Sequence, residues 1–275
     1  MYYRRNRIHK KRFKYSFKSF LKTRNILILT GSVFLLILFI YVLNNQSSPK
    51  SIDSDSFRVG LHTQIPGMSS RRYYDEPVKG FEVDLAKALA KDIYGNEQIL
   101  QIVEVNAKTA KAMLSNNDID AIICQQTAVK NDANYSYSSS YFKDNIRFVY
   151  KDGNYSNISA LSGKKVGVIT KSYELDQLTE YNKRENLNME IIELSSYSDA
   201  KAMIDMKNLD AFCSVSKKMQ IFDLNSYKLI GEDLGSVDYC VVTRLEDKDL
   251  TKKIDEYIKK ITENGQIDQM KSNWK

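Results

Sequence analysis

The chain has 275 residues, 43% of them hydrophobic and 27% charged, which is the composition of a globular protein with room for one large domain or two smaller ones. Its formal net charge of +7 comes from the first 25 residues, which carry ten Lys and Arg and no acid. The rest holds 31 of the 41 basic residues against 34 acidic ones, a net charge of about −3. This balance excludes the basic face that nucleic-acid binding by the folded part would need.

An uncharged stretch, ILILTGSVFLLILFIYVL at 26–43, follows the basic tail at 1–25. As a helix rising about 1.5 Å per residue it would reach roughly 27 Å, close to the about 30 Å of a hydrocarbon core. Neither a small-residue cleavage site nor a cysteine follows it, which favours an uncleaved anchor over a signal peptide. The basic flank predicts a single-pass protein of the cell membrane, with a cytoplasmic N-terminus and an extracellular domain.

A polar, Ser-containing stretch at 44–55 predicts a flexible linker, and a first set of alternating strands and helices follows it. In the segment 80–95, apolar residues from Phe81 to Ile93 recur every four positions, and Gly95 stands where a helix cap belongs. The predicted elements are strands at 57–61, 99–105 and 119–124, and helices at 80–95 and 110–114.

A second set of similar length begins after a Ser- and Tyr-rich stretch at 135–142. It comprises strands at 147–151, 164–169, 188–194, 209–215, 227–231 and 238–242, helices from Ser172 and over 200–206, and two terminal helices at 250–261 and 267–274. This alternation predicts an α/β fold with largely parallel strands and helices on both faces. Two such sets suggest two lobes rather than one continuous sheet, with a ligand beyond the carboxyl ends of the strands.

Motifs for enzymatic or metal chemistry are lacking. The sequence has no G-x-S-x-G, no phosphate-binding G-x-x-x-x-G-K-[ST] loop and no C-x-x-C, and it has only two histidines, so neither a cofactor nor a metal is expected. Cys124, Cys213 and Cys240 each lie in an apolar stretch and are expected to be buried free thiols. A disulfide between Cys213 and Cys240 with one spare thiol is the open alternative.

Five segments stand in order along the chain: GFEVDLAKALA at 80–90, NNDIDAII at 116–123, LSGKKVGV at 161–168, Leu209–Asp210–Ala211, and NGQIDQMKSNW at 264–274. Together they resemble the bacterial extracellular solute-binding proteins of family 3, the polar amino-acid receptors of ABC importers. The resemblance implies the type II periplasmic binding protein fold. Lobe 1 would be 56–148 plus 240–275, lobe 2 would be 149–239, and hinge strands would lie at 147–151 and 238–242.

The resemblance also implies a function, the capture of a small polar solute by lobe closure and its delivery to a membrane permease. Family members that bind α-amino acids hold the carboxylate with an Arg and the ammonium with an Asp. Here the stretch 124–142 has no Arg, and Val215 stands at the Asp position. An ordinary α-amino acid is therefore a doubtful ligand, because the charge-assisted pair with Arg is among the strongest hydrogen-bonded contacts.

The resemblance and the strand-end positions together suggest a set of ligand-binding candidates. Ser172 begins a lobe 2 helix and is also read as a helix cap; Gln126 and Thr127 follow a strand; Lys130 is a substitute for the missing Arg. The full set is Met68, Tyr73, Gln126, Thr127, Lys130, Ser172, Ser214 and Val215.

Two other functions compete with solute binding. Some proteins of this fold are cyclohexadienyl dehydratase-like enzymes, which would need an acid in the cleft, and Glu82, Asp132 and Asp238 are the candidates. The other alternative is an interaction or sensor domain that has lost amino-acid binding. The sequence favours a binding protein that is not an enzyme.

Overall fold

The computed structural model describes residues 55–106 and 109–274, together with 35–36. The predicted basic tail, almost all of the predicted membrane span at 26–43 and the linker lie outside these residues. Among the described residues, no helix combines the length and the apolar character that a membrane crossing requires.

A first α/β set is built on parallel strands. It consists of β1 (Phe57–Leu61), α2 (Phe81–Tyr94), η1 (Glu97–Ile99), β4 (Leu100–Glu104), α3 (Ala110–Ser115) and β5 (Ala121–Thr127), with a small hairpin of β2 (Gln64–Ile65) and β3 (Ser69–Ser70). Strand β1 lies between β4 and β5 and is parallel to both. The alternation of β5 buries Ala121 and Ile123 with α2, whereas Ile122 and Cys124 pack with α3.

A second α/β set repeats this plan. It consists of η2 (Ile158–Leu161), β7 (Lys165–Ile169), α4 (Tyr173–Arg184), β8 (Glu190–Leu194), α5 (Tyr197–Asp205), β9 (Ala211–Val215) and η3 (Ser216–Ile221). Strand β7 lies between β8 and β9, again in parallel register. Cys213 of β9 packs in the cluster that contains Leu178 of α4, whereas Phe212 packs with Ile204 of α5. Helices therefore cover both faces of this set too.

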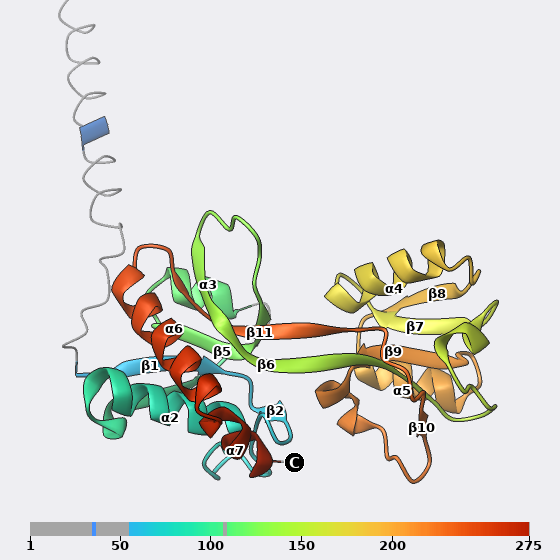
Figure 1. Cartoon of the computed structure of the whole chain (residues 1–275), viewed down its shortest axis with the longest axis horizontal. Coiled ribbons are helices and arrows are strands. Elements are labelled where there is room, and N and C mark those ends of the chain that lie inside the picture. Colours follow the sequence, from blue (N-terminus) through green and yellow to red (C-terminus); the bar gives the residue numbers. More distant parts are fainter. Residues whose placement is uncertain (1–34, 37–54, 107–108, 275) are drawn as a thin grey trace, which may run out of the picture. The chain divides into compact units, whose positions relative to one another are not determined.

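Two long antiparallel strands, β6 (Tyr135–Tyr150) and β11 (Gly235–Arg244), run from one set to the other (Figure 1). β11 pairs with β5, and the far end of β6 pairs with β9. The strand order is β4-β1-β5-β11-β6-β9-β7-β8, with β10 (Lys228–Leu229) beside β6. The expectation of two separate sheets was wrong, because these two strands hydrogen-bond to both sets and make one mixed sheet of nine strands.

The structure confirms some of the predicted helix and strand boundaries and changes others. The Gly95 cap is confirmed, since its φ is 74° and its N–H donates to the Lys91 carbonyl. The predicted strand at 147–151 begins much earlier, because the Ser- and Tyr-rich stretch pairs with β11, and the predicted strand at 227–231 is only two residues long. The three cysteines are buried free thiols, as expected.

The C-terminal helices α6 (Lys248–Glu263) and α7 (Gln266–Ser272) pack on α2 of the first set (Figure 1). Leu250, Ile254 and Ile258 of α6 are buried in the same cluster as the apolar face of α2. The indole Nε1 of Trp274 donates to the Asp84 carboxylate at 2.7 Å. Trp274, next to the C-terminal residue, is thereby fastened to α2 of the first set.

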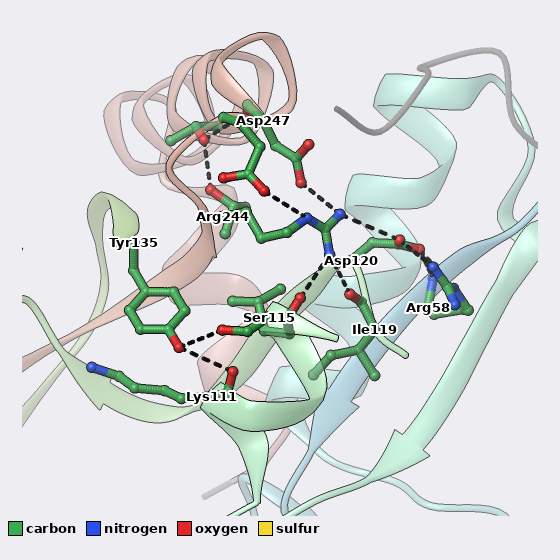
Figure 2. A network of polar contacts seen from close by, with 12 residues as sticks. Arg58, Lys111, Ser115, Ile119, Asp120, Tyr135, Arg244 and Asp247 are labelled. Carbon is green, nitrogen blue, oxygen red and sulfur yellow. Dashed lines mark hydrogen bonds and ion pairs between the residues drawn. The ribbon is translucent and has the colours of Figure 1, made fainter. Parts of the chain in front are cut away.

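A buried ionic network joins the end of β11 to the first set (Figure 2). Arg244, with 2% of its surface exposed, donates to the carbonyls of Leu114 and Ile119 at 3.0 and 2.8 Å and pairs with Asp247 at 2.6 Å. The fully buried Asp120 forms an ion pair with Arg58, with 2.8 Å between Asp120 Oδ1 and Arg58 Nη2. The buried charges of Arg244 and Asp120 are thus paired with opposite charges, and Arg244 also with carbonyl oxygens. These contacts offset the free-energy cost of removing the two charges from water.

Arg244→Met should lower the free energy of unfolding by about 3–5 kcal/mol, because it leaves a buried carboxylate and two carbonyls without their donor. The matched control Arg147→Met removes an ion pair with Asp233 whose partners are about one third exposed, and should cost about 0–1 kcal/mol. Urea unfolding followed by circular dichroism measures both. Equal losses of unfolding free energy in the two variants would contradict the stabilising role given to the buried Arg244 network.

Candidate functional site

A pocket of about 620 Å³ has walls from both α/β sets. The first set contributes the residues that follow β1 and the end of β5, and the second contributes the start of α5 and η3. The lining residues are His62, Gln64, Ile65, Pro66, Cys124, Gln125, Gln126, Tyr197, Ser198, Lys217, Lys218, Gln220 and Ile221. The pocket lies at the carboxyl ends of parallel strands, where α/β sheets bind ligands, and its volume suits a small solute.

A fully buried carboxylate, Glu82, fixes one wall of the pocket. Tyr141 Oη donates to Glu82 Oε1 at 2.6 Å, and Ser69 Oγ donates to Oε2 at 2.8 Å. Both the backbone N–H and the side-chain amide of Gln125 also donate to Glu82. Gln125 has a φ of 51°, a left-handed conformation that costs energy outside glycine, and these hydrogen bonds hold it there.

Burial raises the pKa of Glu82 to about 7, and the four hydrogen bonds that favour the ionised form only partly oppose this shift. Burial also raises the pKa of the neighbouring Cys124 thiol to about 12. The thiol is therefore protonated at neutral pH and is not set up as a nucleophile.

The other lining residues give the pocket a cationic character. Lys217 and Lys218 come from η3, and His62 follows β1. Burial, together with the charge of Lys218, lowers the pKa of His62, so the imidazole is neutral at pH 7. Among the described residues, no Asp or Glu lines the pocket.

Residues 57–275 match the family of bacterial extracellular solute-binding proteins, family 3. The chain belongs to this family. Among family members, the ABC transporter glutamine-binding protein GlnH of Bacillus subtilis is 26% identical over 229 residues, covering 81% of this chain and 82% of the relative. The arginine-binding extracellular protein ArtP of the same organism is 24% identical, covering 72% of this chain and 78% of the relative.

Solved structures show the same type II periplasmic binding protein fold. The probable amino-acid ABC transporter extracellular-binding protein ytmK from Bacillus subtilis matches with a TM-score of 0.69 and 17% identity, over 80% of this chain and 97% of that chain. An ancestral arginine-binding protein bound to arginine matches with a TM-score of 0.64 and 22% identity, over 81% and 99%. At these identities the likeness establishes the fold.

The structure brings only part of the predicted site of this solute-binding protein to the pocket. Gln126 lines it, and Ser214 lies 3.1 Å from the hydroxyl of the lining residue Tyr197. Thr127 ends β5 opposite Tyr239 of β11. Ser172 caps α4, accepting from the Leu175 N–H at 3.2 Å.

Four other predicted residues lie elsewhere. Met68 and Val215 are buried in the core, with 0% and 1% of their surface exposed. Tyr73, 62% exposed, and the exposed Lys130 lie outside the pocket lining. Met68 lies in the turn between β2 and β3 with its side chain in the core, so the residues of this hairpin that reach the pocket are the earlier Gln64, Ile65 and Pro66.

Sequence reasoning missed His62, Tyr197, Lys217 and Lys218. Each follows a strand that ends at the pocket, so the strand-end rule that selected Gln126 could have found them. The family pattern instead directed attention to the start of α4, whereas in this structure the start of α5 lines the pocket.

The three carboxyl groups considered for an enzyme are not in the pocket lining. Glu82 is fully occupied by its four hydrogen bonds, Asp132 accepts from Tyr137 Oη at 2.6 Å, and Asp238 is exposed and accepts from Ser140 at 3.2 Å. None of the three carboxyl groups is therefore presented to the cavity, since the lining among the described residues contains no Asp or Glu.

Glu82→Gln should flatten the pH dependence of stability. Since the folded-state pKa of about 7 exceeds the ordinary 4.5, the folded chain binds more protons between these values. Stability due to Glu82 is complete below about pH 4.5, falls by on the order of 3 kcal/mol as the pH rises to 7, and is then constant.

Urea unfolding of wild type and Glu82→Gln between pH 5 and 8 measures this difference, with the exposed Glu97→Gln as control. Burial also raises the pKa of Asp144, so the wild-type slope has two sources and the difference between variants is the relevant quantity. Parallel profiles for wild type and Glu82→Gln would contradict the buried-charge account.

Proposed function

We propose that the chain is a membrane-anchored, extracellular solute-binding protein of an ABC importer, and that its pocket captures a small polar solute. The pocket carries this proposal, because it is of suitable size, is built from both α/β sets at their strand ends, and has polar side chains from both sets in its lining. Relatives named for glutamine and arginine binding support a solute related to amino acids.

The proposed lobes are 56–148 plus 240–275, and 149–239, with β6 and β11 as the hinge strands. The packing of α6 and α7 on α2 supports a discontinuous lobe 1, because it returns the end of the chain to the first set. A solute touching both walls would stabilise the arrangement in which the walls approach, and a membrane permease would recognise that arrangement.

The proposed contacts centre on Gln125 and Gln126, which both line the pocket. Ser214 acts through its hydrogen bond to Tyr197. The family's carboxylate-binding Arg is missing from 124–142, and the position of its ammonium-binding Asp is the buried Val215. These departures predict weak binding of ordinary zwitterionic amino acids.

Pocket occupancy can be tested with thermal unfolding of the full-length chain against a panel of polar solutes. A solute at a hundredfold excess over its Kd should stabilise the fold by about 2.7 kcal/mol. Gln126→Leu should abolish the shift, whereas Gln101→Leu, at an exposed position on β4, should preserve it. A shift that is the same in both variants would place the solute elsewhere, and no shift with any solute would contradict the proposed function.

The anchor rests on the uncharged sequence 26–43, its basic flank and the missing cleavage site. We expect the full-length chain in the membrane fraction, with its lobes open to protease added outside the cell. Determining the N-terminal residue of the mature protein completes the test. A secreted product beginning near Asn44 would refute the anchor.

A further inference from the structure

The two lysines of η3 are held in position by the crossing strands. Ser216 Oγ donates to the Asn145 carbonyl at 3.0 Å, and the Lys217 backbone N–H donates to Asp144 Oδ2 at 3.2 Å. Tyr239 Oη of β11 donates to the same Asp144 oxygen at 3.1 Å. η3 is therefore fastened to β6, and through it to β11, immediately before its two lysines enter the pocket wall.

The side chain of Lys217 extends from η3 toward the first set. Its Nζ lies 5.7 Å from the centroid of the Phe142 ring and 3.8 Å from where a Cβ on Gly67 would stand. Gly67 adjoins Pro66, another lining residue. The ammonium group is thus placed beside the wall opposite its own backbone.

Neither Lys217 nor Lys218 forms an ion pair with any carboxylate of the described residues. The nearest carboxylates lie outside the pocket lining. Glu104 pairs with Arg71 and accepts from Thr63, and Glu82 accepts four hydrogen bonds from neutral donors. Asp144 accepts from Tyr239 and from the Lys217 N–H, and the charges of Lys217 and Lys218 oppose the burial that raises its pKa. The pocket therefore contains two cations whose counter-charge is not supplied by its own lining.

His62 adds an uncharged hydrogen-bonding group to this cationic wall. Its Nδ1 is buried and has no hydrogen-bond partner within the described part of the chain. A buried polar atom without a partner is costly, but Nδ1 has almost no accessible surface, so a ligand atom would reach it only if the lining moved.

We propose that the pocket takes a small dicarboxylate that lacks an ammonium group, with its carboxylates paired to Lys217 and Lys218. The inference rests on the proposed function and narrows its ligand. An ammonium or guanidinium group would lie against two cations with no lining carboxylate to compensate it, and such like-charge placement is how binding sites reject wrong ligands. Gln126, which also lines the pocket, would complete the polar contacts.

Succinate and L-aspartate are matched probes, because they differ by one ammonium group. Isothermal titration of the full-length chain at low salt should show succinate binding at least about tenfold tighter than L-aspartate, with no heat from L-arginine. Succinate affinity should fall as salt rises, because the contacts are ionic. A dicarboxylate should likewise raise the unfolding temperature.

Lys217→Met and Lys218→Met should each weaken succinate binding by about tenfold or more, while Lys228→Met, at an exposed position on β10, should leave it unchanged. Lys217→Arg keeps the charge and should retain most of the affinity. If a Met variant fails to fold, the wild-type comparison of succinate with L-aspartate still decides.

Tighter binding of L-arginine, L-glutamine or L-aspartate than of succinate would overturn the inference and leave the proposed solute-binding function standing. Succinate binding that is insensitive to both lysine variants would overturn the inference as well. No binding of any of these solutes, under conditions where the chain is folded, would count against both.

Discussion

The pairing of β6 with β11 is the constraint on which the rest of the architecture depends. Each strand hydrogen-bonds to one α/β set at one end and continues into the other, so the two sets share one sheet instead of forming two. The same strands carry Asp144 and Tyr239, which hold η3, and Arg244, which is tied to the first set. The position of the pocket walls follows from this ladder.

Buried charged residues near β6 and β11 are stabilised in two different ways, by opposite charges or by neutral donors. Arg244 and Asp120 are enclosed with opposite charges and carbonyls, an arrangement that fastens the C-terminal part of the chain to the first set. Glu82 is enclosed with neutral donors only, and the cost appears as a pKa raised to about 7. In return its oxygens hold Gln125 in a left-handed backbone conformation on the pocket wall.

The fold was largely predictable because strand and helix periodicities are local properties of the sequence. Gly95, the apolar face from Phe81 to Ile93 and the family segments each gave a correct local inference. The single sheet was not predicted, because β6 begins in a stretch of Ser and Tyr whose strand character depends on its pairing with β11. The composition of this stretch gives no information about β11, which follows much later in the sequence.

The site was predictable only where it follows from strand ends. Gln126, near the end of β5, lines the pocket. Met68, in the turn between β2 and β3, is buried in the core, and so is Val215, the last residue before η3. The lysines could be counted from the sequence, yet their convergence with His62 depends on how the two sets are joined. Which charged side chains meet at a site depends on the tertiary structure. The sequence analysis therefore predicted the cationic contact at Lys130, whereas Lys217 and Lys218 line the pocket.

The most direct test of the central claim, that both α/β sets form one binding site, is hydrogen–deuterium exchange of the full-length chain with and without succinate. We predict slower exchange at 122–127 and at 214–221 together, with unchanged exchange in α6. Slowing confined to one of the two segments, or to neither while succinate is bound, would contradict the claim.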